Sequence, residues 1–139
     1  PALLDDLGLA QALEHLGREW SARTAVRVVT QCAADTAPLP GAVETAIFRV
    51  AQEALGNIEA HASAHQVQLS LHRDGAALEL HIQDDGCGFD ADRVARSPRA
   101  GLGLTHMRER IEQLGGRFTL TSDAQGTQLR ARFGREALT

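Results

Sequence analysis

The chain has 139 residues, of which 43% are hydrophobic and 23% charged, and its formal net charge is −4. This length and composition are those of one soluble globular domain. The negative net charge does not indicate the basic surface that direct nucleic-acid binding requires. All 14 basic residues are arginine, which excludes a P-loop lysine. Cys32 and Cys87 match no zinc spacing and are expected to be reduced thiols, and no signal peptide or spanning segment is visible.

The N-terminal part is predicted to contain a helical lead-in, a short strand and a long helix. Residues 1–23 place apolar side chains at helical spacing, with a possible break at Gly8. Alternation from Val26 to Thr30 predicts a strand, and a proline-containing loop follows it. The next helix is expected over about residues 41–61. Its apolar stripe consists of Val43, Ile47, Val50, Ala54 and Ile58.

The C-terminal part is predicted to contain two strand pairs separated by a helix. Strands over 66–73 and 77–83 flank Asp74-Gly75, a dipeptide typical of hairpin turns. A loop over 89–100 then leads to a helix over 104–114, which Gly115-Gly116 ends. Strands over 117–121 and 127–133 close the chain. This order indicates an α/β (α+β) two-layer sandwich, with a mixed sheet and helices on one face.

The stretch Asp84-Asp85-Gly86-Cys87-Gly88-Phe89 directly follows the predicted strand over 77–83. A carboxylate at a strand end, followed by two glycines, suits a ligand that lies close against the backbone. Asp84 would accept a hydrogen bond from an exocyclic amine such as N6 of adenine, whereas the keto group of guanine would offer it no proton. The ordinary alternative to a ligand site is that Asp84 and Asp85 are simply two acidic residues of a turn.

The long helix carries Glu53, Asn57 and His61 at i, i+4 and i+8, on one line beside the apolar stripe. A solvated helix face is the ordinary explanation, but asparagine is a poor helix former with no local reason to lie mid-helix. Asn57 offers a neutral oxygen to Mg²⁺, which completes its shell with phosphates and water.

Gly101 and Gly103 come just before the predicted second helix, where free N–H groups and the helix dipole favour phosphate oxygens. A base pocket, a metal ligand and an anion-binding helix start together indicate a nucleoside triphosphate site. Met107 is expected in the core.

Two other motifs are discounted. Residues 86–91 fit the spacing G-x-G-x-x-A of a dinucleotide-binding turn, but Pro98 and the polar residues after Asp90 predict a loop there and not a helix. His61 and His65 lie at i, i+4, but no glutamate follows the first histidine, so a zinc protease site is not expected.

Taken together, these segments resemble the sequence boxes of the GHKL (HATPase) superfamily, and more narrowly the ATP-binding catalytic domain of nitrate-sensor-type sensor histidine kinases. The resemblance spans nearly the whole chain. It rests on Glu53-x-x-x-Asn57 with His61, on Asp84-Asp85-Gly86-x-Gly88-Phe89, on Gly101-Leu102-Gly103-Leu104-x-x-Met107-Arg108-Glu109-Arg110, on Gly126-Thr127, and on Leu3 to Leu13, which resembles the end of a dimerisation helix.

The resemblance implies the Bergerat fold, ATP with Mg²⁺, and transfer of the γ-phosphate to a histidine on a dimerisation domain. By carry-over, Asp84 binds adenine, partly through water near Thr127, and Asn57 holds Mg²⁺. Glu53 assists transfer or orients the metal shell. The remaining carried-over nucleotide-binding residues are His61, Gly86, Gly88, Gly101, Leu102, Gly103 and Leu104.

The resemblance also implies an organisation for the whole protein. Residues 1–23 would end the dimerisation helix and its linker, 24–135 would form the catalytic domain, and 136–139 would be a tail. A response regulator, often with a helix-turn-helix output domain, would receive the phosphoryl group. The fragment would be a monomeric cytoplasmic domain of a homodimeric parent anchored in the inner membrane.

Two departures from the family pattern bear on activity. Ala60 stands where the family often has lysine, so an arginine of the 93–99 loop or Arg108 would have to replace that contact. The phosphoacceptor histidine is expected before Pro1, since its context is found at none of His15, His65, His72, His81 and His106. The alternatives are a degenerate nucleotide-binding regulatory module and an anti-sigma-factor-type serine kinase.

Overall fold

The computed structural model describes residues 2–33, 38–61, 63–86 and 100–139, without the side chains of residues 61 and 100–102. Its elements are α1 Ala2–Leu7, α2 Leu9–Thr24, β1 Arg27–Cys32, α3 Gly41–His61, β2 Gln66–Asp74, β3 Ala77–Asp84, α5 Ala100–Gln113, β4 Arg117–Asp123, β5 Gly126–Phe133 and η1 Arg135–Leu138. The predicted order of helices and strands is confirmed.

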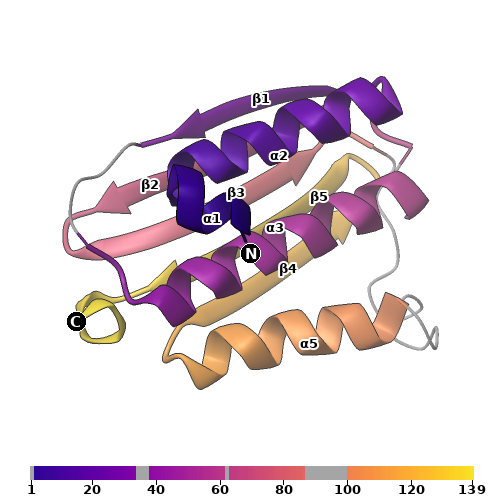
Figure 1. Ribbon diagram of the computed structural model, residues 1–139. Helices are drawn as coiled ribbons and strands as arrows, with labels where there is room; N and C mark the ends of the chain where they lie inside the picture. Colours follow the sequence, from indigo (N-terminus) through magenta and orange to yellow (C-terminus); the bar gives the residue numbers. More distant parts are fainter. Residues whose placement is uncertain (1, 34–37, 62, 87–99) are drawn as a thin grey trace.

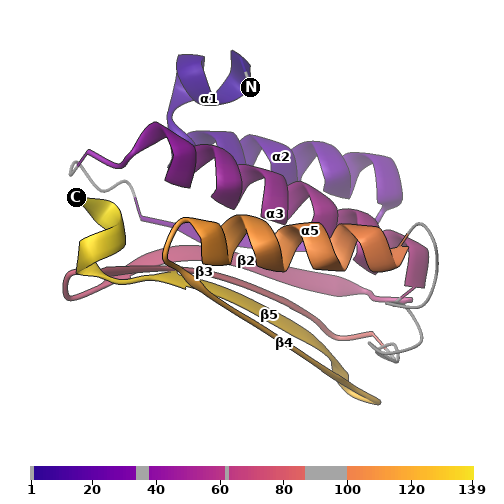
Figure 2. The same cartoon turned by 90° about the horizontal axis from the view of Figure 1, so that it is seen from below.

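The five strands form one sheet in the order β1-β2-β3-β5-β4. β1 and β2 pair in parallel, and the other neighbours are antiparallel, so the sheet is mixed as predicted. Helices α2, α3 and α5 cover one face of the sheet, and α1 lies across the outer side of the helical layer (Figures 1 and 2). This is the expected two-layer α/β sandwich.

The core lies between the sheet and the three covering helices. Alternate residues of each strand point into it, because successive side chains of a strand face opposite sides. The predicted stripe of α3 is buried along its whole length. Helix α2 belongs to the same core, since Leu9, Leu13 and Trp20 are buried in it.

The backbone changes direction where the sequence allows a left-handed conformation. Gly8 separates α1 from α2 with a φ of 79°. Gly115 has a φ of 82°, and its N–H donates to Glu112 while the N–H of Gly116 donates to Ile111. This pair of bonds is a Schellman C-cap. It ends α5 at Gly115-Gly116, as the sequence predicts.

Helix α5 begins at Ala100, four residues before the predicted start. The prediction that Gly101 and Gly103 lie just before the helix is therefore wrong, because they belong to its first turn. The first N–H groups of a helix have no partner inside it, so the low helix propensity of glycine has less weight at this end.

Candidate nucleotide-binding site

Asp84 ends strand β3 with its side chain on the helix-covered side of the sheet, where it is only 3% exposed. Its Oδ1 accepts a hydrogen bond of 2.8 Å from the N–H of Gly86. Its buried Oδ2 has no hydrogen-bond partner among the described residues. Burial raises the pKa of Asp84, and the N–H groups of Gly86 and Thr127 oppose that shift. One carboxylate oxygen is thus left for a donor from a ligand, because a buried polar atom without a partner is costly.

Asp84 and Asn57 line one crevice between the sheet and the helices α3 and α5. The other lining residues are Ala54, Ile58, Ile82, Leu104, Met107, Leu120, Thr127 and Leu129. The walls are therefore apolar, with the polar groups gathered at a few points. This arrangement is typical of pockets that hold a flat aromatic ligand and orient it by one or two hydrogen bonds.

The crevice is narrow, with an accessible volume of about 10 Å³, which is room for about one water molecule. An adenine ring would need lining side chains to separate before it could reach Asp84. Met107 on α5 is the most adaptable of these side chains, because its unbranched chain has three rotatable bonds. The prediction that Met107 lies in the core is confirmed, since it is buried, but it also forms part of the crevice wall.

Thr127 and Gly126 bring the start of β5 against the end of β3. Thr127 lines the crevice, is 6% exposed and shares a hydrogen bond of 3.0 Å with the hydroxyl of Ser122. Gly126 has a φ of 139°, and a Cβ added there would lie 2.1 Å from the carbonyl oxygen of Asp84. Only glycine fits at this point. The Gly126-Thr127 pair, which resembles the family pattern, is therefore also required by the geometry of this junction.

Glu53 does not line this crevice. It is exposed on α3 and lines an adjoining groove between α3 and α5. A Cβ built on Gly103 would lie 3.0 Å from Oε2 of Glu53. The carboxylate therefore lies beside the first turn of α5, whose free N–H groups are the predicted phosphate contacts.

The remaining predicted site residues are only partly described. Gly101 and Leu102 belong to the first turn of α5, and Leu104 lines the crevice one residue after Gly103. Gly88, Cys87 and the arginines of the 93–99 loop lie outside the described residues, and so does the side chain of His61. His61 is the last residue of α3, and His65 lies just before β2.

Arg108 does not face the crevice. Its guanidinium lies 5.0 Å from the ring centroid of Phe118, donates to the carbonyl oxygen of Phe118 and pairs with Glu112 at 3.6 Å. It therefore anchors α5 to β4, and it is not positioned to replace the lysine that the family often has at position 60.

Asp85 has a structural role that the sequence did not reveal. Its exposed carboxylate accepts hydrogen bonds from the N–H groups of His65 and Gln66, at 2.9 and 3.0 Å. These bonds lower the pKa of Asp85. The bonds join the loop that follows α3 to the end of β3, so they fix the helix that carries Asn57 relative to the strand that carries Asp84.

Among the described residues, no three His, Cys, Asp or Glu side chains gather as a metal site. Such a cluster is not required for Mg²⁺, which commonly takes one or two protein ligands and completes its shell with phosphate and water. The half-buried amide of Asn57, opening into the same crevice as Asp84, fits that single-ligand arrangement. No helix in the described part of the chain is long and apolar enough to cross a membrane.

Residues 42–137 match the profile of the family described as histidine kinase-, DNA gyrase B-, and HSP90-like ATPase. The chain belongs to this ATPase family.

The curated relatives include two sensor kinases. The sensor histidine kinase MctS of Rhizobium johnstonii is 37% identical over 137 residues, which are 99% of this chain and 30% of that protein. The signal transduction histidine-protein kinase/phosphatase UhpB of Salmonella typhimurium is 39% identical over 130 residues, 93% of this chain and 25% of that protein. The chain thus spans less than a third of these relatives.

Solved structures share the fold. The histidine kinase domain of the blue-light activated kinase from Erythrobacter litoralis superposes with a TM-score of 0.76 at 23% identity, over 92% of this chain and 61% of that one. The histidine kinase AdeS of Acinetobacter baumannii superposes with a TM-score of 0.69 at 14% identity, over 91% of this chain and 63% of that chain. The predicted Bergerat-type ATPase fold is confirmed.

Proposed function

We propose that this ATPase-family domain is the catalytic domain of a sensor histidine kinase. It would bind ATP with Mg²⁺ and donate the γ-phosphate to a histidine on a dimerisation domain of the same protein. The observation that carries the proposal is the buried Oδ2 of Asp84, which lacks a partner in the described residues and shares a crevice with Asn57.

Each site residue has a distinct part in this function. Asp84 would accept a hydrogen bond from the adenine amine, while the apolar walls hold the ring. Asn57 would hold Mg²⁺ through its amide oxygen, which supplies charge neutralisation for the phosphates. The N–H groups in the first turn of α5 would bind phosphate oxygens, with Gly103 allowing Glu53 to lie close by. Glu53 would orient the metal shell or assist transfer.

The wider arrangement follows from the same proposal. A response regulator would receive the phosphoryl group, and the parent protein would be a homodimer anchored in the membrane, with this domain on the cytoplasmic side. Residues 1–23 would lead in from the dimerisation helix and 24–135 would form the catalytic domain. The packing of α2 into the shared core indicates that the lead-in docks firmly on that domain.

The two alternatives gain no support from the comparisons. The curated relatives described above carry names of histidine kinases, which favours neither an anti-sigma-factor-type serine kinase nor a regulatory module without activity. The crevice keeps its unpaired carboxylate oxygen, which a module that no longer binds nucleotide would have no reason to bury.

Nucleotide binding by the purified protein tests the base contact. ATP is expected to bind with Mg²⁺ at least tenfold more tightly than GTP, and Asp84→Asn is expected to remove most of this difference, because the amide both donates and accepts. Equal affinity of the unmodified protein for ATP and GTP would refute the role of Asp84.

Phosphotransfer in the full-length kinase tests the metal contact. Asn57→Ala is expected to abolish Mg²⁺-dependent autophosphorylation, whereas Asn57→Asp, which retains an oxygen ligand, should keep part of it. An unchanged rate in Asn57→Ala would show that the metal is held elsewhere.

A further inference from the structure

Ser122 belongs to a row of polar side chains that crosses three strands and ends at Asp84. Ser122 on β4 pairs with Thr127 on β5, and Gln83 on β3 pairs with Gln128 on β5. Because β3 and β5 are antiparallel, the next positions along them, Asp84 and Thr127, lie opposite each other. Ser122, Thr127 and Asp84 therefore follow one another across β4, β5 and β3.

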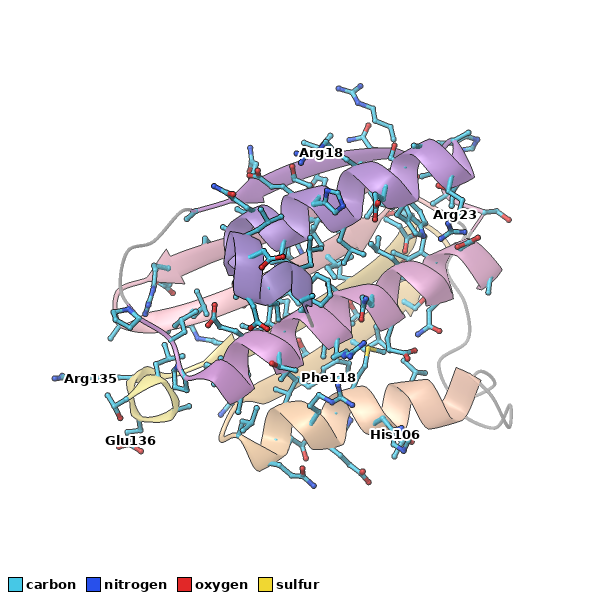
Figure 3. The ribbon with its side chains drawn as sticks, viewed as in Figure 1. Arg18, Arg23, His106, Phe118, Arg135 and Glu136 are labelled. Atoms are coloured by element: carbon cyan, nitrogen blue, oxygen red, sulfur yellow. The ribbon has the colours of Figure 1, made fainter. Side chains whose placement is uncertain are left out.

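This row lies on the side of the sheet that the helices cover. Phe118, Leu120 and Ser122 alternate with exposed residues of β4, so their side chains point the same way. Leu120 lines the nucleotide crevice, and Phe118 points toward α5 (Figure 3). Ser122 does not line the crevice itself, but its hydroxyl bonds to Thr127, which does.

The hydrogen bond between Ser122 and Thr127 has a defined direction. The two hydroxyl oxygens lie 3.0 Å apart, a distance at which either could donate. Burial raises the pKa of Asp84, whereas the hydroxyl of Thr127 is among the groups that lower it, so this hydroxyl stabilises the ionised carboxylate. An ionised carboxylate only accepts, and a hydroxyl has one proton. Thr127 therefore directs its proton toward Asp84 and accepts the bond from Ser122.

The edge of adenine that would reach Asp84 has a donor and an acceptor side by side. The amine N6 would donate to Oδ2 of Asp84, which has no partner among the described residues. The neighbouring ring nitrogen N1 then needs a donor, and the hydroxyl of Thr127 lines the same crevice. Guanine reverses both groups, with an acceptor at O6 and an N–H at N1. A proton on Thr127 that faces the crevice thus favours the same base as the carboxylate of Asp84 does.

We propose that Ser122 is a positioning residue of the nucleotide site, which donates to Thr127 and so directs the proton of Thr127 toward N1 of the bound adenine, directly or through one water molecule. This inference rests on the proposed ATP-binding function and adds to it a residue that does not touch the nucleotide. Because Ser122 acts through the direction of one proton, its loss weakens nucleotides that have an acceptor at N1 and spares those that lack one.

Affinities of the purified protein for nucleotides with Mg²⁺ test this role. Ser122→Ala is expected to weaken ATP binding about three- to tenfold, as for the loss of one neutral hydrogen bond, and to weaken GTP binding less than about twofold. In 1-deaza-ATP a C–H group replaces N1. This analogue should bind the unmodified protein about three- to tenfold more weakly than ATP does, and Ser122→Ala should change its affinity less than about twofold, because the two losses remove the same interaction. 7-Deaza-ATP, which retains N1, should show the full effect of Ser122→Ala.

Two further variants separate this role from a general effect on the strands. Ser122→Thr keeps the hydroxyl and should bind ATP within about twofold of the unmodified protein. Ser70→Ala is the matched control, because Ser70 is a half-buried serine of β2 whose hydroxyl donates to the carbonyl oxygen of His81, on the side of the sheet away from the core. It should leave all of these affinities unchanged.

Equal weakening of ATP and 1-deaza-ATP by Ser122→Ala would overturn the proposal, because it would assign Ser122 to the packing of the site and not to the proton on Thr127. An unchanged affinity of Ser122→Ala for ATP would also overturn it, and so would 1-deaza-ATP that binds the unmodified protein as tightly as ATP. Failure of the proposed function itself would show separately, as an unmodified protein that binds ATP no more tightly than GTP.

Discussion

Gly103 in the first turn of α5 lies directly against the side chain of Glu53 on α3, so that a Cβ at Gly103 would lie 3.0 Å from Oε2 of Glu53. The Gly103→Ala change should therefore displace this carboxylate with little disturbance of the backbone, because Glu53 is exposed and can move. We expect a loss of phosphotransfer of about tenfold with an unchanged or slightly higher melting temperature, since alanine favours the helix by about 1 kcal/mol over glycine.

Gly56→Ala provides the comparison for Gly103→Ala. Gly56 lies inside α3, and an added Cβ there would meet nothing within 4 Å. This variant should gain stability by about 0.5–1 kcal/mol and keep its full transfer rate. Equal transfer rates in Gly103→Ala and Gly56→Ala would show that the position of Glu53 does not matter for the reaction.

Asp84→Asn is expected to stabilise the free protein while it weakens ATP binding. Burial raises the pKa of Asp84, so the folded state holds this proton more tightly than the unfolded state does. The cost of the ionised carboxylate is therefore absent in acid and develops as pH rises from the ordinary aspartate range through the raised pKa. Removing the charge should increase the free energy of unfolding at pH 7 and change it little below about pH 3.5.

Affinity should change in the opposite direction to stability. Loss of a charged hydrogen bond to the adenine amine should cost about 1.5–3 kcal/mol, which is one to two decades in the dissociation constant. Urea unfolding across pH and ATP titration measure the two effects on the same variant. A destabilised Asp84→Asn protein at pH 7 would mean that the buried carboxylate is fully satisfied without ligand.

Asp85→Ala should show the opposite dependence on pH. Hydrogen bonds from the N–H groups of Gln66 and His65 lower the pKa of Asp85, so its contribution to stability is present at neutral pH and disappears as pH falls through that lowered pKa. We expect a loss of about 1 kcal/mol at pH 7, limited by the exposure of the carboxylate, and faster amide exchange at residues 65 and 66. Unchanged exchange at these two amides would contradict the assignment.

Gly126→Ala should disrupt the junction between β5 and β3. The added methyl carbon would lie 2.1 Å from the carbonyl oxygen of Asp84, and the φ of 139° is itself unfavourable for alanine. Since backbone has to move, we expect a loss of roughly 2–4 kcal/mol, seen as a lower midpoint in thermal unfolding. Gly134→Ala, which meets nothing within 4 Å, should unfold close to the unmodified midpoint.

The order of elements could be predicted because their sequence patterns are local. The alternation in 77–83, the Asp74-Gly75 turn and the apolar stripe of α3 each specify one element from neighbouring residues. The convergence of Asp84 and Asn57 on one crevice was also expected, since a strand end and a helix face carried matching chemistry.

Other features depend on contacts that no local pattern encodes. Helix α5 begins at Ala100, four residues before the predicted start, because the low helix propensity of Gly101 and Gly103 does not decide where a helix begins. The hydrogen bonds of Asp85 to the N–H groups of His65 and Gln66 join segments about 20 residues apart. The attachment of Arg108 to Phe118 likewise became visible only in three dimensions.

The two neighbouring aspartates at the end of β3 have different partners, since Asp84 lines the crevice and Asp85 accepts hydrogen bonds from the N–H groups of His65 and Gln66. A deletion of one residue between the Gly75 turn and Asp84 would put Asp85 in the place of Asp84 and Gly86 in the place of Asp85, since a shift of one position reverses every side chain of a strand. Asp85 would then enter the crevice, and the N–H groups of Gln66 and His65 would lose their acceptor. The number of residues in this strand is therefore under as strict a constraint as their identity, and length variation in this chain should be tolerated elsewhere.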